Sequence, residues 1–189
     1  MKGTPDKKII IIICAVIVVL LGVIFFLKSS QSTQQPQKDA SSDTTSTKTA
    51  TTYHTNSYSL SYPHTWTKSE KQLTDDQGTV MTLLPQKENS GQFSTITIEV
   101  LNSELTTIES VSNLFEALNY AKTTTTVAGI SAEKYTAVLP TQDGSLHSIA
   151  YVFQQNEKIY SLKLEYINSN TNVQLEGKFY QLVSSFLPQ

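Results

Sequence analysis

A run of nineteen residues without a charge or a strongly hydrogen-bonding side chain constrains this chain more than any other feature. It extends from Ile9 to Leu27 and reads IIIIICAVIVVLLGVIFFL. A helix of this length rises about 28 Å, close to the roughly 30 Å hydrocarbon core of a bilayer. The run is also longer than the ~7–15 residue apolar core of a cleavable signal. We therefore predict a transmembrane helix, with a cleaved signal and a buried core helix as the alternatives.

The charges around the run predict its orientation. Three lysines precede it within residues 1–8, whereas Lys28 alone follows directly. The positive-inside bias places such an N-terminus in the cytoplasm and the rest of the chain outside the plasma membrane. The single cysteine, Cys14, follows Ile13 rather than the small residue that a lipoprotein processing site requires, so we interpret it as an apolar position of the membrane helix.

A polar segment separates the run from the globular part. Residues 28–52 contain no aromatic and no branched aliphatic side chain, so they have nothing to bury against the entropy cost of ordering. The sequence thus predicts a cytoplasmic tail (1–8), a transmembrane helix (9–27), a disordered linker rich in Ser, Thr and Gln (28–52) and one globular domain (53–189).

The composition of the globular domain excludes several classes of function. Residues 53–189 carry eight lysines against thirteen Asp and Glu, and the whole chain has no arginine. An acidic surface without guanidinium groups is unsuited to phosphate backbones, so we expect no nucleic-acid partner. The domain also lacks cysteine, which excludes a disulfide, a Cys-ligated zinc and a thiol nucleophile.

Hydrophobic periodicity predicts the elements of the domain. Alternating or apolar side chains predict strands that begin at Tyr58, Val80, Phe93 and Ala132, with Pro63, Pro85 and Pro140 as stops, and residues 123–127 have high β propensity. Asp143-Gly144 is a turn signal. The clearest hairpin pairs 146–154 with 159–167, and its second arm has one apolar and one polar face, which indicates one buried face and one solvated face.

Two segments have helical spacing instead. Apolar residues three and four apart predict helices over 108–118 and 175–186, the first with a capping box of Thr106 and Glu109, the second capped by Asn172 or Thr171. About three strands, a helix, three strands and a helix make an α+β fold, in which a mainly antiparallel sheet is flanked by helices.

Four stretches of the domain resemble a known family. Residues 58–66 read YSLSYPHTW, which is similar to the aromatic opening strand of PsbP-like domains with its Tyr-Pro-x-x-Trp ending, and 127–132 read VAGISA, similar to their v-x-G-x-x-a segment. The hairpin over 146–167 and the final helix match in order and spacing. The resemblance covers roughly 53–189 and implies an α-β-α sandwich used mostly for binding and assembly, as in extrinsic subunits of the oxygen-evolving complex and a Ran-binding import factor. The chain departs from the photosynthetic members in its predicted membrane anchor.

No motif marks a catalytic, cofactor or metal site. The sequence has no G-x-S-x-G elbow, no glycine-rich phosphate loop and no H-E-x-x-H. The three histidines, His54, His64 and His147, are far apart, and we interpret them as structural or solvated rather than as ligands. Asp75-Asp76 is interpreted as a solvated turn, because a calcium loop needs more oxygen ligands at fixed spacing.

Aromatic residues supply the one candidate binding feature. Tyr58, Tyr62, Pro63 and Trp66 are either a fold signature that fills the core or the lining of an apolar groove. We expect a protein without catalytic activity that binds the membrane through Ile9 to Leu27 and an envelope protein through its outer domain. The alternatives are a carrier or sensor of an apolar small molecule or lipid, and a hydrolase with an unmarked site.

Overall fold

The computed structural model describes residues 50–74, 77–85, 93–168 and 171–189. The predicted tail, the predicted transmembrane helix with Cys14, most of the predicted linker and Asp75-Asp76 lie outside these residues. Within them, no helix combines the length and the apolarity needed to cross a membrane. All the described residues belong to one compact unit, Ser46–Gln189.

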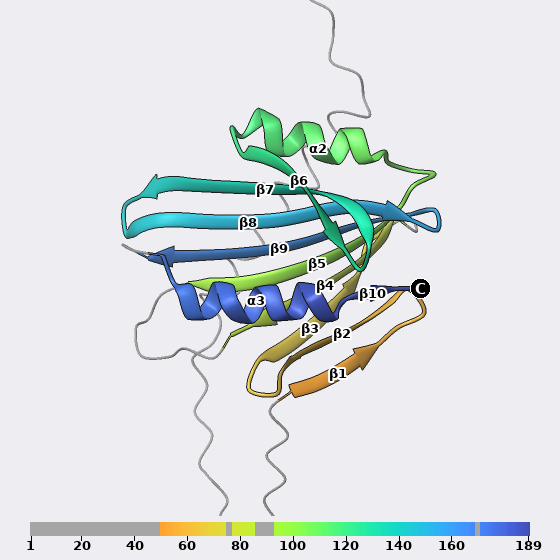
Figure 1. Cartoon of the computed structure of the whole chain (residues 1–189), viewed down its shortest axis with the longest axis horizontal. Helices are drawn as coiled ribbons and strands as arrows, with labels where there is room; N and C mark the ends of the chain where they lie inside the picture. Colours follow the sequence, from red (N-terminus) through yellow and green to blue (C-terminus); the bar gives the residue numbers. More distant parts are fainter. Residues whose placement is uncertain (1–49, 75–76, 86–92, 169–170) are drawn as a thin grey trace, which may run out of the picture. The chain divides into compact units, whose positions relative to one another are not determined.

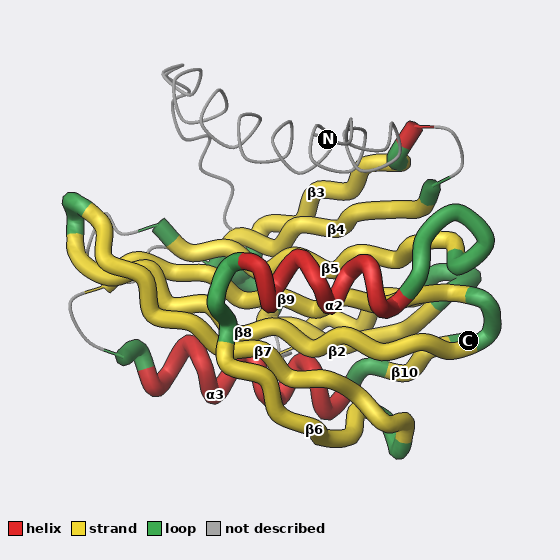
Figure 2. Tube along the Cα trace, turned by 90° about the horizontal axis from the view of Figure 1, so that it is seen from above, coloured by secondary structure: helices red, strands yellow, loops and turns green. Residues whose placement is uncertain are grey.

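A seven-stranded antiparallel sheet forms the centre of this unit, with β3 and β6 as its end strands (Figures 1 and 2). The order across the sheet is β3 (Thr67–Gln72), β4 (Gly78–Leu84), β5 (Ser94–Asn102), β9 (Lys158–Asn168), β8 (Gly144–Gln155), β7 (Ile130–Thr141) and β6 (Ala121–Val127). Tight turns join most neighbours: Asn156 and Glu157 connect β8 to β9 with φ of 50° and 60°, the left-handed pair that a two-residue type I′ turn requires.

A second sheet of three strands lies at the chain ends of the domain. In it β2 (Tyr58–Pro63) pairs with β1 (Ala50–His54) on one side and with β10 (Leu187–Pro188) on the other, so the last residues return beside the first strands (Figure 1). The backbone N–H of Gln189 donates to the carbonyl of Ser57 at 2.8 Å, which fixes the C-terminus next to the β1–β2 turn.

The two helices pack on opposite faces of the large sheet. Helix α3 (Val173–Ser185) and the small sheet share one core with Tyr151, Phe153, Tyr160 and Leu162, whereas α2 (Ile108–Ala117) packs on a core that contains Ala150, Val152 and Ile159. Since neighbouring strand residues point to opposite faces, these two sets define an α3 face and an α2 face.

Several sequence predictions are confirmed. The strand over 58–62, the alternating strand β5, the long β8–β9 hairpin, the turn at Asp143-Gly144 and both helices are present within a few residues of the predicted bounds. The side chain of Asn172 caps α3, where its Oδ1 accepts from the backbone N–H of Leu175 at 3.1 Å.

Three strands escaped the sequence analysis. Five strands precede the first of the two described helices rather than three, because β1 and β3 were not predicted, and β10 was missed as well. Four strands rather than three lie between the two helices, because residues 123–127, noted only for their β propensity, form the separate strand β6. Strand β3 reads TKSEKQ and is exposed along its whole length, so it has no apolar alternation to detect. Strand β1 begins at Ala50, so the last three residues of the predicted linker are folded.

Two local predictions were wrong in detail. Pro140 does not end a strand: it lies inside β7 opposite Ser145. Strand β6 pairs with β7 only as far as Thr136, so β7 is an edge at Pro140 and the missing N–H costs no sheet hydrogen bond. The capping box of α2 uses Thr107 and Ser110 instead of Thr106 and Glu109.

The expectation of one solvated sheet face also needs correction. Helix α2 covers part of that face, where Val111, Tyr135 and Val152 are at most 8% exposed. Of the polar residues of β9 there, Ser161 is 3% exposed, whereas Lys163 and Glu165 are half-buried.

Candidate functional site

The four residues proposed from the sequence lie in or beside the core of the α3 face. Tyr58, Tyr62 and Trp66 are 1%, 8% and 6% exposed, and Pro63 is half-buried. The Tyr58 ring stacks on Phe186 of the α3 C-cap at 5.2 Å between centroids. Buried rings of this kind offer little surface to a ligand, so their positions fit a fold signature better than the lining of a groove.

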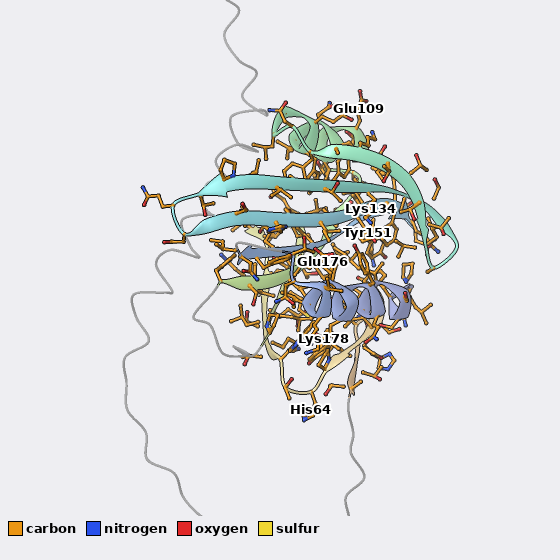
Figure 3. All side chains as sticks on the ribbon, turned by 60° about the vertical axis from the view of Figure 1, so that its left-hand side comes forward. His64, Glu109, Lys134, Tyr151, Glu176 and Lys178 are labelled. Atoms are coloured by element: carbon orange, nitrogen blue, oxygen red, sulfur yellow. The ribbon has the colours of Figure 1, made fainter. Side chains whose placement is uncertain are left out.

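The histidines do not form a site together. His54 and His64 are exposed, at the end of β1 and in the turn after β2, whereas His147 is buried in β8 (Figure 3 labels His64). Among the described residues, no group of three or more His, Cys, Asp or Glu side chains is arranged to hold a metal ion.

Among the described residues, a surface hollow of about 360 Å³ is a candidate binding site. It lies where the β1–β2 turn, the β3–β4 connection, the end of β5 and the β8–β9 turn meet, and we call it the loop-end hollow. Most of its exposed lining is polar. It is lined by Ser57, Gln72, Gly78, Thr79, Val100, Leu101, Asn102, Glu104, Asn156, Glu157 and Lys158.

Backbone constraints hold the walls of the loop-end hollow in place. Gly78 has φ of +144°, and a Cβ at this position would lie 1.9 Å from the Val100 carbonyl oxygen, so only glycine fits there. The backbone N–H of Asn102 donates to Gln77 at 2.9 Å, and that of Ser103 donates to Glu157 at 3.0 Å. The hollow is therefore a preformed feature of the fold.

Hydrogen bonds also connect the two sheets at the loop-end hollow. Lys158 Nζ donates to the Ser57 hydroxyl at 2.8 Å, and the Tyr160 hydroxyl donates to the Ser57 carbonyl at 3.0 Å. Glu104 and Glu157 add two carboxylates to the single ammonium of Lys158. An open polar hollow with both signs of charge is suited to groups on a protein surface, whereas an apolar ligand needs an apolar enclosure.

A buried serine on the α2 face is the arrangement closest to a catalytic one. Ser112 is 5% exposed and donates to Glu133 Oε2, which also accepts from the Tyr135 hydroxyl at 2.6 Å. The other oxygen of Glu133 lies 2.8 Å from Lys122 Nζ, which also contacts Glu116 at 3.1 Å.

The electrostatics of Glu133 argue against nucleophilic catalysis. Burial alone would raise its pKa, but hydrogen bonds from Lys122, Ser112 and Tyr135 outweigh this and lower the pKa below the ordinary value. A general base works best with a pKa near the operating pH, so this carboxylate is poorly suited to activate the serine. The cluster ties α2 to β6 and β7 instead.

Aromatic and charged side chains also gather beside α3. Lys134 Nζ lies 5.1 Å from the ring centroid of Tyr180 and 5.7 Å from that of Tyr151 (Figure 3). His147 stacks on Tyr166 at 4.8 Å, and the Tyr166 hydroxyl donates to Glu176 at 2.6 Å. Burial, and then the hydrogen bond to Glu176, raise the pKa of Tyr166. These contacts fasten α3 to the sheet at Glu176 and Tyr180.

Sequence reasoning found none of the residues of the loop-end hollow. They come from segments up to a hundred residues apart, and only Gly78, beside the Asp75-Asp76 turn signal, stood out locally. The hollow becomes visible once strand order brings the four chain segments together.

Comparisons with known proteins show what the chain is similar to. A family model described as PsbP-like protein matches residues 10–187. The solution structure of cyanobacterial PsbP (CyanoP) from Synechocystis sp. PCC 6803 is similar with a TM-score of 0.56 and 13% identity, over 79% of this chain and 98% of that one. A crystal structure from Bacteroides thetaiotaomicron gives a TM-score of 0.48 at 6% identity, over 70% of this chain and 45% of that one.

No curated protein sequence matches the chain. The family model nevertheless spans most of the chain, and the CyanoP structure has the same fold. The chain belongs to the family of PsbP-like proteins.

Proposed function

We propose that this protein is a membrane-tethered, extracytoplasmic binding module that helps to assemble an envelope complex and has no catalytic role. The observation that carries the proposal is the loop-end hollow, an open polar concavity of about 360 Å³ with walls fixed by backbone hydrogen bonds and by Gly78. A preformed surface of this kind loses little conformational entropy when a partner binds.

The family supports the same proposal. PsbP-like domains are known for binding and assembly, and the CyanoP structure shows that fold in a protein whose name relates it to PsbP. The hydrolase alternative gains no support from the described residues, because the buried Ser112 faces a carboxylate with a lowered pKa and no metal cluster is present there. The polar lining of the hollow does not suit a carrier of apolar molecules.

The predicted anchor gives the proposal its location. A run from Ile9 to Leu27 in the membrane, followed by a flexible linker, would confine the domain to within a few tens of ångströms of the membrane surface. Confinement raises the effective concentration of the domain near partners in the same membrane, so a weak contact at the hollow is enough for binding. The N-terminus is then cytoplasmic and the domain is outside.

Proximity labelling in the native cell tests this proposal. The labelling enzyme is best fused to the C-terminus, because the backbone N–H of Gln189 donates a hydrogen bond to Ser57 and so lies next to the loop-end hollow. The full chain fused there through a flexible linker is expected to label a small set of envelope proteins. A Glu104→Lys/Lys158→Glu double variant, which inverts charges in the hollow, should no longer label these envelope proteins. Labelling of cytoplasmic proteins alone, or an unchanged set in the variant, would contradict the proposal.

A further inference from the structure

The two end strands of the seven-stranded sheet differ in how their free edges are protected. An end strand leaves every second residue with its backbone N–H and C=O pointing away from the sheet, which can template pairing with another strand. In β6 the turn to β7 consists of Ala128 and Gly129, with φ of 52° and 80°. Residues flanking such a two-residue turn exchange hydrogen bonds, and the pattern alternates from there.

This alternation identifies the free groups of β6. Val127 pairs with Ile130 across the turn, so Val127, Thr125, Thr123 and Ala121 bond to β7. The backbone groups of Lys122, Thr124 and Thr126 therefore point outward. In the part of the chain that the structure describes, they have no backbone partner.

Charged and aromatic side chains cover the opposite edge. Strand β3 carries Lys68 and Glu70, which are paired at 3.6 Å. Tyr53 of β1 reaches across both: its hydroxyl donates to Glu70, and Lys68 Nζ lies 3.8 Å from the centre of its ring. Natural sheets block edge pairing with charges and covering segments of this kind.

Strand β6 lacks this protection. It reads AKTTTTV, its first four residues are exposed, and it contains no proline. Its single charge is turned toward the domain itself, since Lys122 Nζ lies 2.8 Å from Glu133 and 3.1 Å from Glu116. Figure 2 shows β6 at the end of the sheet with β7 on one side.

We propose that β6 pairs with the β6 strand of a second copy of this chain, antiparallel and with Thr124 on the two-fold axis. In this register Thr124 faces Thr124 of the other copy and Lys122 faces Thr126, so the outward groups of the two strands meet each other. The three facing pairs exchange about two hydrogen bonds each. The proposal does not depend on the loop-end hollow, which contains no residue of β6.

The sequence of β6 is self-complementary in this register. Thr123 faces Thr125 on the α3 face and Thr124 faces itself on the α2 face, and cross-strand Thr–Thr pairs stabilise antiparallel sheets. The lysines do not face each other, so no like charges are opposed. If two copies of β3 paired in the same antiparallel way, centred on Glu70, the two Glu70 carboxylates would face each other and repel. We therefore expect β6, and not β3, to pair with a second copy.

A disulfide trap tests the register directly. In a Cys14→Ala background the full chain in lipid nanodiscs has no other thiol, so Thr124→Cys reports only on β6. Facing residues of a hydrogen-bonded pair are about 5.5 Å apart between Cα atoms, within the range that a disulfide spans. Mild oxidation should give a covalent dimer with Thr124→Cys and none with Ser69→Cys, which places an exposed thiol on β3.

A backbone variant keeps the test independent of thiol chemistry. Thr124→Pro removes an outward N–H while it leaves the bonds to β7 intact, and should weaken self-association about tenfold or more in sedimentation experiments. Thr124→Val keeps the backbone and should retain the association. A monomer at all concentrations, equal crosslinking at Ser69→Cys, or crosslinking of Thr124→Cys only to a different protein would overturn the proposal.

Discussion

The two faces of the seven-stranded sheet contribute unequally to the fold. The α3 face holds a continuous core in which α3 and the small sheet bury Tyr58, Phe179 and Phe186 at 0–1% exposed. The α2 face has a smaller core, where α2 contributes Val111 and the partly buried Ile108 and Phe115. We infer that the α3 face supplies most of the stability, and that α2 is the element most easily detached.

The rest of the α2 face is polar and half-buried. Lys163 and Glu165 form an ion pair at 3.2 Å with side chains 29% and 20% exposed. Burial raises the pKa of the neighbouring Glu99, although Lys163 acts in the opposite direction. Desolvation offsets much of what such pairs contribute, so this region adds specificity of strand pairing more than stability.

The largest expected effect is on the α3 face. Phe179→Ala removes a fully buried ring of α3 that packs against Tyr151 of the sheet, and should lower the free energy of unfolding by about 3–5 kcal/mol. Urea denaturation followed by the fluorescence of Trp66 measures this loss. The neighbouring Tyr180→Ala is the control, since that side chain is 36% exposed and should cost about 1 kcal/mol or less. Equal losses would contradict the assignment of the core.

A pH effect also belongs to the α3 face. Burial and then Tyr180 raise the pKa of Tyr151 to about 12, whereas an unfolded tyrosine ionises near pH 10. Because the folded state holds this proton more tightly, its contribution is complete below about pH 10 and is lost as the pH rises toward 12, an effect of about 2 kcal/mol. Urea midpoints between pH 9 and 12 measure it, and Tyr151→Phe should flatten part of the decline. An identical decline in that variant would rule out Tyr151 as its source.

The matching core substitution on the α2 face should cost less. Val111→Ala shortens a side chain that is 8% exposed in the smaller core, and should cost about 1–2 kcal/mol. Hydrogen exchange should show the amides of α2 exchanging faster in this variant, while those of α3 keep their protection. If the amides of both helices lost protection equally, the two faces would be one cooperative unit.

The smallest expected effect is a gain in stability rather than a loss. His147 is 9% exposed and its Nε2 is buried with no hydrogen-bond partner among the described residues, although the ring stacks on Tyr166. His147→Phe keeps a stacking ring and removes the unsatisfied nitrogen, so it should raise the stability by about 1 kcal/mol. His147→Ala, which loses the ring as well, should destabilise. A loss of stability in His147→Phe would indicate that Nε2 has a partner in solution.

The sequence predicts the elements whose burial is periodic. Strand β5, the β8–β9 hairpin and α3 follow from alternation or helical spacing, and Asn172 was recognisable as a cap. Strands β1 and β3 were not predictable in this way, because β3 is exposed throughout and β1 alternates between exposed and half-buried positions without a strong apolar pattern. Their sheet pairing is dictated by β2 and β4.

The loop-end hollow was out of reach for a different reason. Its residues lie in turns and strand ends, where side-chain type is a weak guide, and they meet only because β3, β5 and β8 end at the same side of the domain. The aromatic residues that did stand out, Tyr58, Tyr62 and Trp66, lie in the core. The side chains that stand out in the sequence thus belong to the core, whereas the proposed binding surface is formed by residues without a sequence signal.

Site-specific photo-crosslinking tests the central claim, that the protein binds a partner at the loop-end hollow, most directly. A photoreactive amino acid at Glu104, an exposed residue of the hollow, is compared in the native cell with one at Gln181 on the exposed side of α3. We predict a discrete adduct with an envelope protein from position 104 and none from position 181. No adduct at position 104, or the same adduct at both positions, would contradict the account.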